Sequence, residues 1–251
     1  MRSIDKSKIE MCVIFFAFKQ HPEYPLILLA NRDEFYERPT AAAEFWQDFP
    51  DIFAGRDLVH GGTWLGITKR GRFAAVTNYR DPNALRGKFS RGDLVGDFLK
   101  TNESVEDYLT KIQKDAAQYS GFNLLVGEFS SQMQTLGYYS NRKDTVKILA
   151  PGIYGLSNHL LDTPWRKVSK GKAALTRFLQ NGELEKDRFF ELLSDKTLAD
   201  DADLPDTGIG FEREKLLSAI FIETPIYGTR SSSVVLVDKN YEISLDERNF
   251  Y

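Results

Sequence analysis

Cys12 is the residue with the clearest chemical potential, and it is the only cysteine in the 251-residue chain. A thiolate is a strong nucleophile, and a cysteine at the start of a mature chain also carries an α-amino group on the same residue. With an ordinary pKa of about 7.7–8.0, that amine could take the thiol proton directly or through water. Nucleophile and base would then be one residue.

A charged tetrad, Asn31-Arg32-Asp33-Glu34, offers help to this thiol. Arg32 and Asp33 follow Cys12 by 20 and 21 residues. Arg32 would lower the thiol pKa, and Asp33 would orient the ammonium form of the amine. The competing interpretation is a small core cysteine that starts a strand, with the tetrad as a turn closed by surface ion pairs.

The elements that must position these groups are two apolar runs, residues 12–18 and 25–30. Both predict buried strands joined by a short polar link, and the tetrad closes the second strand. In an antiparallel hairpin the end of the second strand lies beside the start of the first. We therefore expect the tetrad near the thiol.

The rest of the chain predicts further strands and helices in blocks. Alternating residues around the turn at Gly71 predict a β-meander over 54–80, and Ser104 with Asp107 resembles a capping box. Loops are expected over 35–40, 155–159 and 200–206. The remaining expectations are helices over 90–100, 104–119, 164–182, 186–193 and 212–218, and strands over 122–129, 133–139, 146–149, 221–238 and 241–245.

Three further side chains leave alternatives open. Arg230 beside three serines suits an anion or carbonyl site, and a solvated turn explains the same run. Trp64 and Tyr79 would fill the core or wall an acyl pocket.

Composition limits the function classes. A net charge of −3 with interspersed signs predicts no nucleic-acid or anionic membrane partner. No apolar run approaches the ~20 residues of a membrane span, so no integral membrane segment is expected. One cysteine excludes an internal disulfide framework and favours a reducing, cytoplasmic location. Three scattered histidines predict no metal site, and no cofactor is expected. The oligomeric state stays open.

The first eleven residues are polar and charged, and Met11 directly precedes Cys12. If Met11 is the translation start, removal of one methionine exposes the cysteine. Otherwise the bond between the two residues must be cut. We interpret residues 1–11 as a leader, either removed or not translated, and residues 12–251 as a single domain.

Several short blocks recur in an order typical of one family. They are Cys12 after a methionine, 30–40 (ANRDEFYERPT), 54–57 (AGRD), 61–66 (GGTWLG), 77–80 (TNYR), 156–159 (LSNH) and 227–232 (YGTRSS). Together they resemble the NRDE family, also called the transport and Golgi organisation protein 2 family. The resemblance covers nearly the whole chain from Cys12 onward.

This family in turn resembles N-terminal-nucleophile hydrolases of the penicillin V acylase, bile salt hydrolase and acyltransferase group. The resemblance implies an α+β fold, a four-layer αββα sandwich of two mainly antiparallel sheets. It implies catalytic roles for Cys12, Arg32 and Asp33, an oxyanion donor in Asn78 or Asn158, and contact of Arg230 with the nucleophile or substrate. The residues expected to bind substrate are Asn31, Trp64, Tyr79 and His159.

Two functions follow as hypotheses. The first is an N-terminal cysteine amidase, thioesterase or acyltransferase that acts on a small-molecule amide or thioester. The alternative is a non-catalytic carrier of acyl lipid or haem in the same pocket, since the resemblance also implies lipid or haem handling and Golgi or mitochondrial organisation for eukaryotic members. Haem ligation has little support, because Val13 rather than proline follows Cys12.

Overall fold

The structure is a computed structural model that describes residues 11–83 and 87–251, without the side chain of Met11. Residues 1–10 of the expected leader therefore lie outside the described residues. Among the described residues, no helix is both long and apolar enough to cross a membrane.

One of the two sheets contains the strand that begins at the cysteine. Within the described residues it has five strands, and every neighbouring pair is antiparallel. In spatial order they are β10 (Gly152–Leu156), β1 (Met11–Phe18), β2 (Leu26–Phe35), β11 (Tyr227–Val237) and β12 (Ile243–Asn249).

The other sheet has seven strands in the described part of the chain, again with antiparallel neighbours. Its spatial order follows the sequence, as in a meander. The strands are β3 (Thr40–Phe45), β4 (Ile52–Asp57), β5 (Leu65–Thr68), β6 (Arg72–Asn78), β7 (Phe122–Phe129), β8 (Gln134–Ser140) and β9 (Lys147–Ile148).

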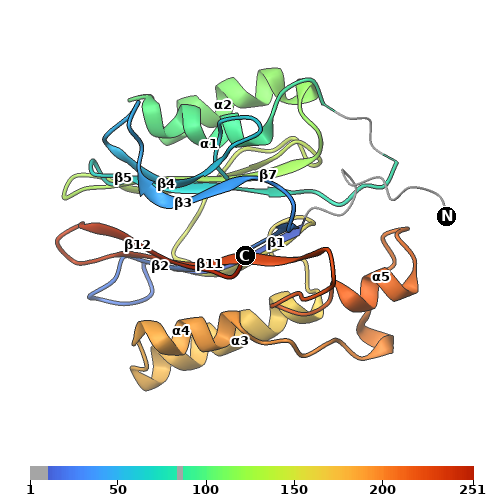
Figure 1. The fold of residues 1–251 in the computed structure, drawn as a ribbon. Coiled ribbons are helices and arrows are strands. Elements are labelled where there is room, and N and C mark those ends of the chain that lie inside the picture. Colours follow the sequence, from blue (N-terminus) through green and yellow to red (C-terminus); the bar gives the residue numbers. More distant parts are fainter. Residues whose placement is uncertain (1–10, 84–86) are drawn as a thin grey trace.

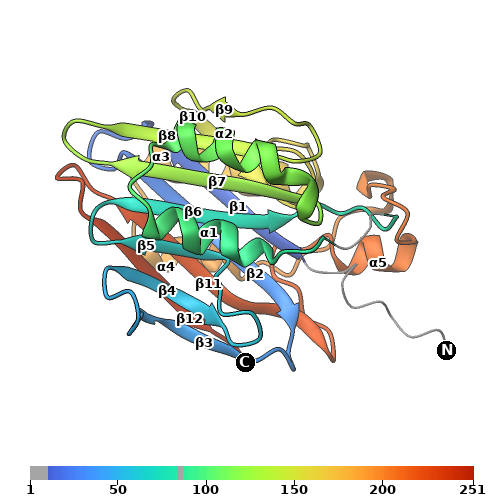
Figure 2. The same cartoon turned by 90° about the horizontal axis from the view of Figure 1, so that it is seen from above.

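The two sheets lie face to face between two layers of helices (Figure 1). α1 (Arg91–Lys100) and α2 (Val105–Asp115) cover the outer face of the seven-stranded sheet. α3 (Arg166–Asn181) and α4 (Lys186–Leu193) cover the outer face of the five-stranded sheet, and α5 (Phe211–Leu216) lies beyond the end of that layer. This is the αββα sandwich that the resemblance implied. Seen from above, the strands of the two sheets cross at an angle (Figure 2).

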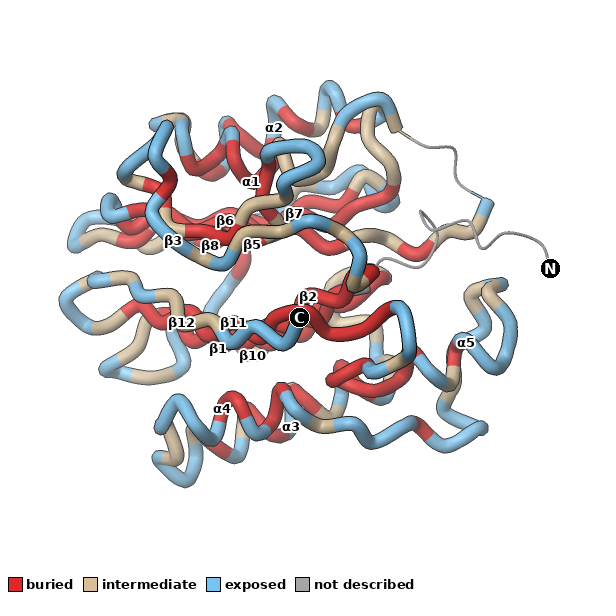
Figure 3. Tube along the Cα trace, viewed as in Figure 1, coloured by how far each residue is buried: buried red, intermediate tan, exposed pale blue. Residues whose placement is uncertain are grey.

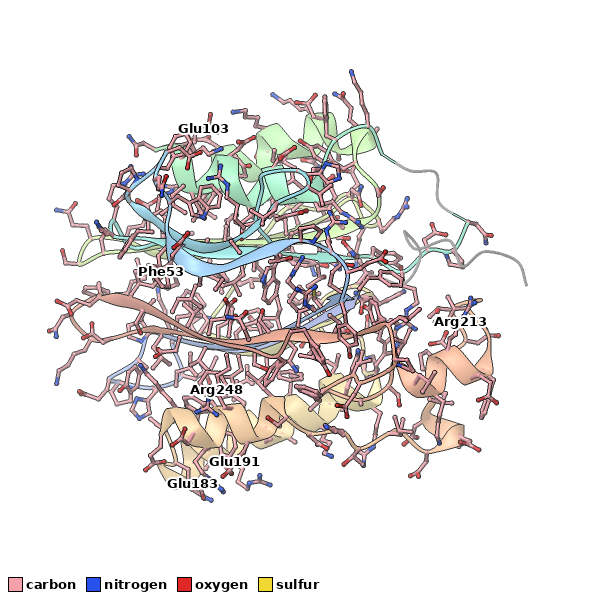
Figure 4. All side chains as sticks on the ribbon, viewed as in Figure 1. Phe53, Glu103, Glu183, Glu191, Arg213 and Arg248 are labelled. Carbon is pink, nitrogen blue, oxygen red and sulfur yellow. The ribbon has the colours of Figure 1, made fainter. Side chains whose placement is uncertain are left out.

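Alternate residues of β1 enter two different cores, because successive side chains of a strand point to opposite faces. Ile14 and Phe16 pack between the two sheets, whereas Val13 and Phe15 pack under α3 and α4. Buried segments accordingly follow the strands, while loops are exposed (Figure 3), and side chains fill the space between the ribbons (Figure 4). By the same alternation, Cys12 shares the face of Ile14 and points between the sheets.

Most predicted elements are confirmed, and several stretches differ. No strand was expected over Thr40–Phe45, which forms β3 beside β4, and the strand expected over 221–238 begins at Tyr227. β2 continues through the tetrad to Phe35 instead of ending at Ala30, because β11 pairs along its whole length. The expected loop at 155–159 begins inside β10, which pairs with β1. The serine run beside Arg230 is buried within β11, so the solvated-turn interpretation is wrong.

Candidate functional site

The hairpin of β1 and β2 brings the cysteine and the tetrad together. Cys12 lies opposite Arg32, and Met11 lies opposite Asp33. Residues directly opposite each other point to the same face, so the thiol and the Arg32 guanidinium both face the other sheet. Asp33 points to the opposite face, toward α3. The nitrogen of Cys12 lies across from the peptide that joins Arg32 to Asp33.

A cavity of about 290 Å³ opens between the two sheets at this end of β1. Five of the six residues expected to be catalytic line it, together with one of the four expected to bind substrate. These residues are Cys12, Arg32, Asp33, Asn78, Arg230 and Trp64. The chain thus gathers residues from both sheets around one thiol.

The Cys12 thiol is buried, with 7% of the residue exposed. Burial raises its pKa to about 12; the nearby Asp33 charge adds to the rise, while the Asp33 backbone and the Arg32 charge oppose it. A thiol with this pKa is protonated at neutral pH. While the Cys12 nitrogen is part of a peptide bond, the site therefore has a nucleophile and lacks a base on that residue.

Asp33, which lies opposite Met11 in the register, has a buried carboxyl. Thr229 Oγ1 donates to its Oδ1 at 2.6 Å, whereas its Oδ2 has no hydrogen-bond partner among the described residues. Burial raises the pKa of Asp33 to about 7, and attraction to Lys167, the Thr229 hydrogen bond and Arg32 limit that rise. A buried acceptor without a donor is suited to receive one.

Lys167 is the buried partner that the sequence analysis missed. It belongs to α3, is 3% exposed, and its Nζ donates to the carbonyl oxygen of Leu217 at 3.0 Å. Burial lowers the pKa of Lys167 to about 8, while the charge of Asp33 raises it. A lysine within the buried stripe of a helix was the signal that could have found it.

Arg230 occupies a β-bulge between Thr229 and Ser231, where β11 shifts its register against β2. Its Nη1 donates to the carbonyl oxygens of Phe35, Tyr36 and Arg38 at 2.9–3.1 Å. The guanidinium therefore fastens the chain that leaves β2 and forms part of the cavity wall. Its expected contact with the nucleophile or substrate stays a prediction.

The two candidate oxyanion donors lie in different places. Asn78 ends β6 and lines the cavity. Asn158 is fully buried, is not part of the cavity wall, and its Nδ2 donates to the backbone oxygen of Asn78 at 3.1 Å. Of the two, only Asn78 lines the cavity, and Asn158 holds its backbone; the oxyanion role stays a prediction.

Three residues expected to bind substrate lie away from the cavity. Asn31 gives its amide hydrogens to the carbonyl oxygens of Leu193 and Ile220, on the helix side of the sheet. Tyr79 stacks on His159, with ring centroids 4.9 Å apart, and neither lines the cavity. All three side chains pack outside the cavity wall, and their contact with substrate stays a prediction.

A side-chain hydrogen bond holds the first residues of β1 against the segment that follows β10. Ser157 Oγ donates to the carbonyl oxygen of Cys12 at 3.0 Å, which ties the end of β10 to the first residues of β1. Among the described residues, no group of three histidine, cysteine or acidic side chains is placed to hold a metal ion.

Fold and site together define an αββα sandwich with a lone cysteine at the mouth of an inter-sheet cavity. The sequence matches the family described as Transport and Golgi organisation 2 over residues 11–251. The chain belongs to this family. It is 40% identical to the Transport and Golgi organization protein 2 homologs of Bos taurus and Homo sapiens, covering 95% of this chain and 93% of each relative. Identity to the Drosophila melanogaster protein is 32%, over 94% of this chain and 91% of that protein.

The comparison with solved structures finds an acid amidase ortholog and a bile acid hydrolase variant. The N-acylethanolamine-hydrolyzing acid amidase ortholog of Caenorhabditis elegans has 9% identity and a TM-score of 0.40, over 96% of this chain and 100% of that one. A variant of the conjugated bile acid hydrolase of Clostridium perfringens has 9% identity and a TM-score of 0.43, over 96% of each chain.

Proposed function

We propose that this protein is an N-terminal cysteine hydrolase or acyltransferase that acts on an amide or thioester of a small molecule. One observation carries the proposal: Cys12 points its thiol into a cavity, and its nitrogen lies across from the peptide between Arg32 and Asp33. The Asp33 carboxyl is buried, and its Oδ2 has no hydrogen-bond partner among the described residues. Cleavage between Met11 and Cys12 would release an α-ammonium group at that nitrogen. Oδ2 of Asp33 would accept a hydrogen bond from it.

The chemistry then follows from the released amine. The amine takes the thiol proton, and the sulfur attacks the substrate carbonyl carbon to form a tetrahedral intermediate. Asn78 donates to the oxyanion. The intermediate collapses to a thioester on Cys12, the bond to the leaving amine or thiol breaks, and the ammonium returns its proton to that group. Water or an acceptor, deprotonated by the amine, attacks the thioester and restores the thiol.

Burial of the thiol explains why cleavage before Cys12 would be needed for activity. A thiol whose pKa is near 12 carries almost no thiolate at pH 7, so the chain that retains Met11 is a dormant form. The family match, which starts at residue 11, agrees with a boundary at this point. A reducing cytoplasmic location suits a protein that depends on a free thiol.

The carrier alternative draws less support from the site. The cavity wall includes five arginines and four acidic residues, which suit a polar ligand better than an acyl chain or a porphyrin. No single contact among the described residues favours acyl lipid or haem. We therefore keep the hydrolase as the proposal.

Turnover of a panel of amides and thioesters tests this function. A chain prepared to begin at Cys12 should hydrolyse at least one class, and Cys12→Ala should lower kcat/KM by about a hundredfold or more, since the variant has no nucleophile. The chain that begins at Met1 should be inactive until cleaved. Equal turnover by Cys12→Ala, with an unchanged melting temperature, would contradict the proposal.

A further inference from the structure

Several guanidinium groups line the cavity wall near the thiol, and they differ in how fully their N–H groups are hydrogen-bonded. Arg32, Arg38 and Arg230 lie on one side of it, with Glu34 and Asp57 as their acidic neighbours. Arg38 is paired with Asp57 at 2.6 Å. Arg230 donates from Nη1 to three backbone oxygens and from Nη2 to the backbone oxygen of Tyr251 at 3.3 Å. The partners of each arginine, rather than the charge count, therefore decide which one can bind a ligand.

Arg32 is the arginine of this group whose guanidinium N–H groups make few hydrogen bonds within the described residues. Within the described residues its one hydrogen bond runs from Nη1 to Thr40 Oγ1 at 3.1 Å. Its nearest carboxylate oxygen, on Glu34, is 3.8 Å from Nη2, which is beyond hydrogen-bond distance. Arg32 nevertheless lines the cavity with only 8% of its surface exposed. A buried guanidinium with open donors calls for an anionic partner.

Arg56 also lines the cavity, and its charge is already balanced by a carboxylate. Arg56 donates to both carboxylate oxygens of Asp48 at 2.7 Å, in a bidentate pair, and stacks on the ring of Trp46. It has little left to offer a ligand. This contrast separates Arg32 from Arg56, although both line the same cavity.

We propose that the substrate carries a carboxylate close to its reacting carbonyl, and that Arg32 binds this carboxylate while Cys12 attacks. An N-acyl amino acid is the simplest molecule of this class. The inference rests on the proposed function, because it takes Cys12 as the attacking group. It goes further by naming the charge and size of the substrate.

The register sets the spacing that this substrate needs. Cys12 and Arg32 are directly opposite, and such pairs have Cα atoms about 4.5–5.5 Å apart with side chains on one face. In an N-acyl amino acid the carboxylate carbon is separated from the acyl carbon by only the nitrogen and Cα. One small molecule therefore spans both groups, and its carboxylate makes the paired hydrogen bonds that arginine favours.

Cavity size agrees with a small substrate. At about 290 Å³, the cavity lies at the small end of the range of ligand pockets, about 300–1,000 Å³. A small acyl group joined to an amino acid is compatible with such a site.

Alkylation of Cys12 tests the carboxylate site without any turnover. The chain has one cysteine, so mass spectrometry of the intact full chain, and of the chain that begins at Cys12, reads its modification directly. Iodoacetate carries a carboxylate, and iodoacetamide is its neutral counterpart. We expect the iodoacetate-to-iodoacetamide rate ratio to be at least tenfold higher for Cys12 than for glutathione. Arg32→Gln should return the ratio to the glutathione value, whereas Arg56→Gln should keep it high.

Protection extends the test to the substrate class. N-acetylglycine should slow alkylation by iodoacetamide, and N-acetylglycinamide at the same concentration should not. Overturning outcomes are a ratio equal to that of glutathione, a high ratio that survives Arg32→Gln, equal protection by inorganic phosphate, or no reaction with either reagent in the chain that begins at Cys12. A high ratio in a chain that turns over neither amides nor thioesters would contradict the proposed function and leave the carboxylate site established.

Discussion

At the scale of single residues, Asp33 is the group whose ionisation should matter most. Its native pKa is about 7, against an ordinary value of 3.8, because burial disfavours the charge. Between these values the native carboxyl retains a proton that the unfolded chain has lost. The free energy of unfolding contributed by this group is therefore full below about pH 4 and declines as the pH rises toward 7.

Asp33→Asn removes this dependence. Urea unfolding at pH 4 to 7 should show the wild-type free energy of unfolding falling relative to the variant, by an amount on the order of a few kcal/mol. Asp48→Asn is the control, since Arg56 lowers the pKa of that exposed carboxyl and its contribution should not fall over this range. A constant difference between wild type and Asp33→Asn would show that the carboxyl is not perturbed.

Residue-scale chemistry was partly predictable from the sequence. Cys12, Arg32 and Asp33 come together because two adjacent apolar strands leave antiparallel pairing as the simplest arrangement. Lys167 was not predictable in this way, because it lies 134 positions after Asp33 and approaches it through helix packing. Local patterns do not report which helix residue meets which strand residue.

At the scale of elements, α3 rests on β1 at a glycine. A Cβ atom on Gly171 would overlap ring atoms of Phe15, which is fully buried. Gly96 in α1 offers the opposite case, since its Cβ would meet nothing closer than 3.8 Å. The two positions therefore differ in the space available for a Cβ atom: α3 approaches the sheet closely at Gly171, whereas Gly96 has room.

Substitution of both glycines separates close packing from helix propensity. Gly171→Ala should lower the free energy of unfolding by about 1–3 kcal/mol, because α3 must shift away from the ring. Gly96→Ala should raise it by up to about 1 kcal/mol, as expected when alanine replaces glycine within a helix. Urea unfolding curves measure both. A similar gain in the two variants would mean that α3 does not lie this close to β1.

Element boundaries failed where a distant strand decides them. The apolar run of β2 ends at Ala30, yet the strand continues to Phe35 because β11 supplies hydrogen bonds beyond it. β10 was missed within a polar loop for a similar reason, since it is an edge strand held by β1. β11 itself holds buried serines that hydropathy alone assigns to the surface.

At the scale of the whole molecule, the packing of the two sheets brings residues from both of them into one site. The inner faces of both sheets form a shared core, and the cavity opens where that core ends at Cys12 and Asn78. Contacts also bridge the layers farther out: Arg248 of β12, labelled in Figure 4, lies over the ring of Phe190 in α4, with its guanidinium carbon 3.9 Å from the ring centroid.

The layer arrangement was predictable through the family resemblance, and the cavity wall was not. Cys12 and Asn78 were expected to meet, whereas His159 and Tyr79 were expected at the site and stack on each other outside it. Which face a loop residue presents depends on how the two sheets rotate against each other. That rotation is a property of the complete fold.

The central claim is that Cys12 becomes an acylated nucleophile once its amine is free. Intact-mass analysis of the chain that begins at Cys12, quenched in acid within seconds of mixing with a small thioester, tests it directly. We predict a mass gain of one acyl group that hydroxylamine removes and that neither Cys12→Ala nor the chain retaining Met1–Met11 acquires. No adduct, or the same adduct on Cys12→Ala, would contradict the account.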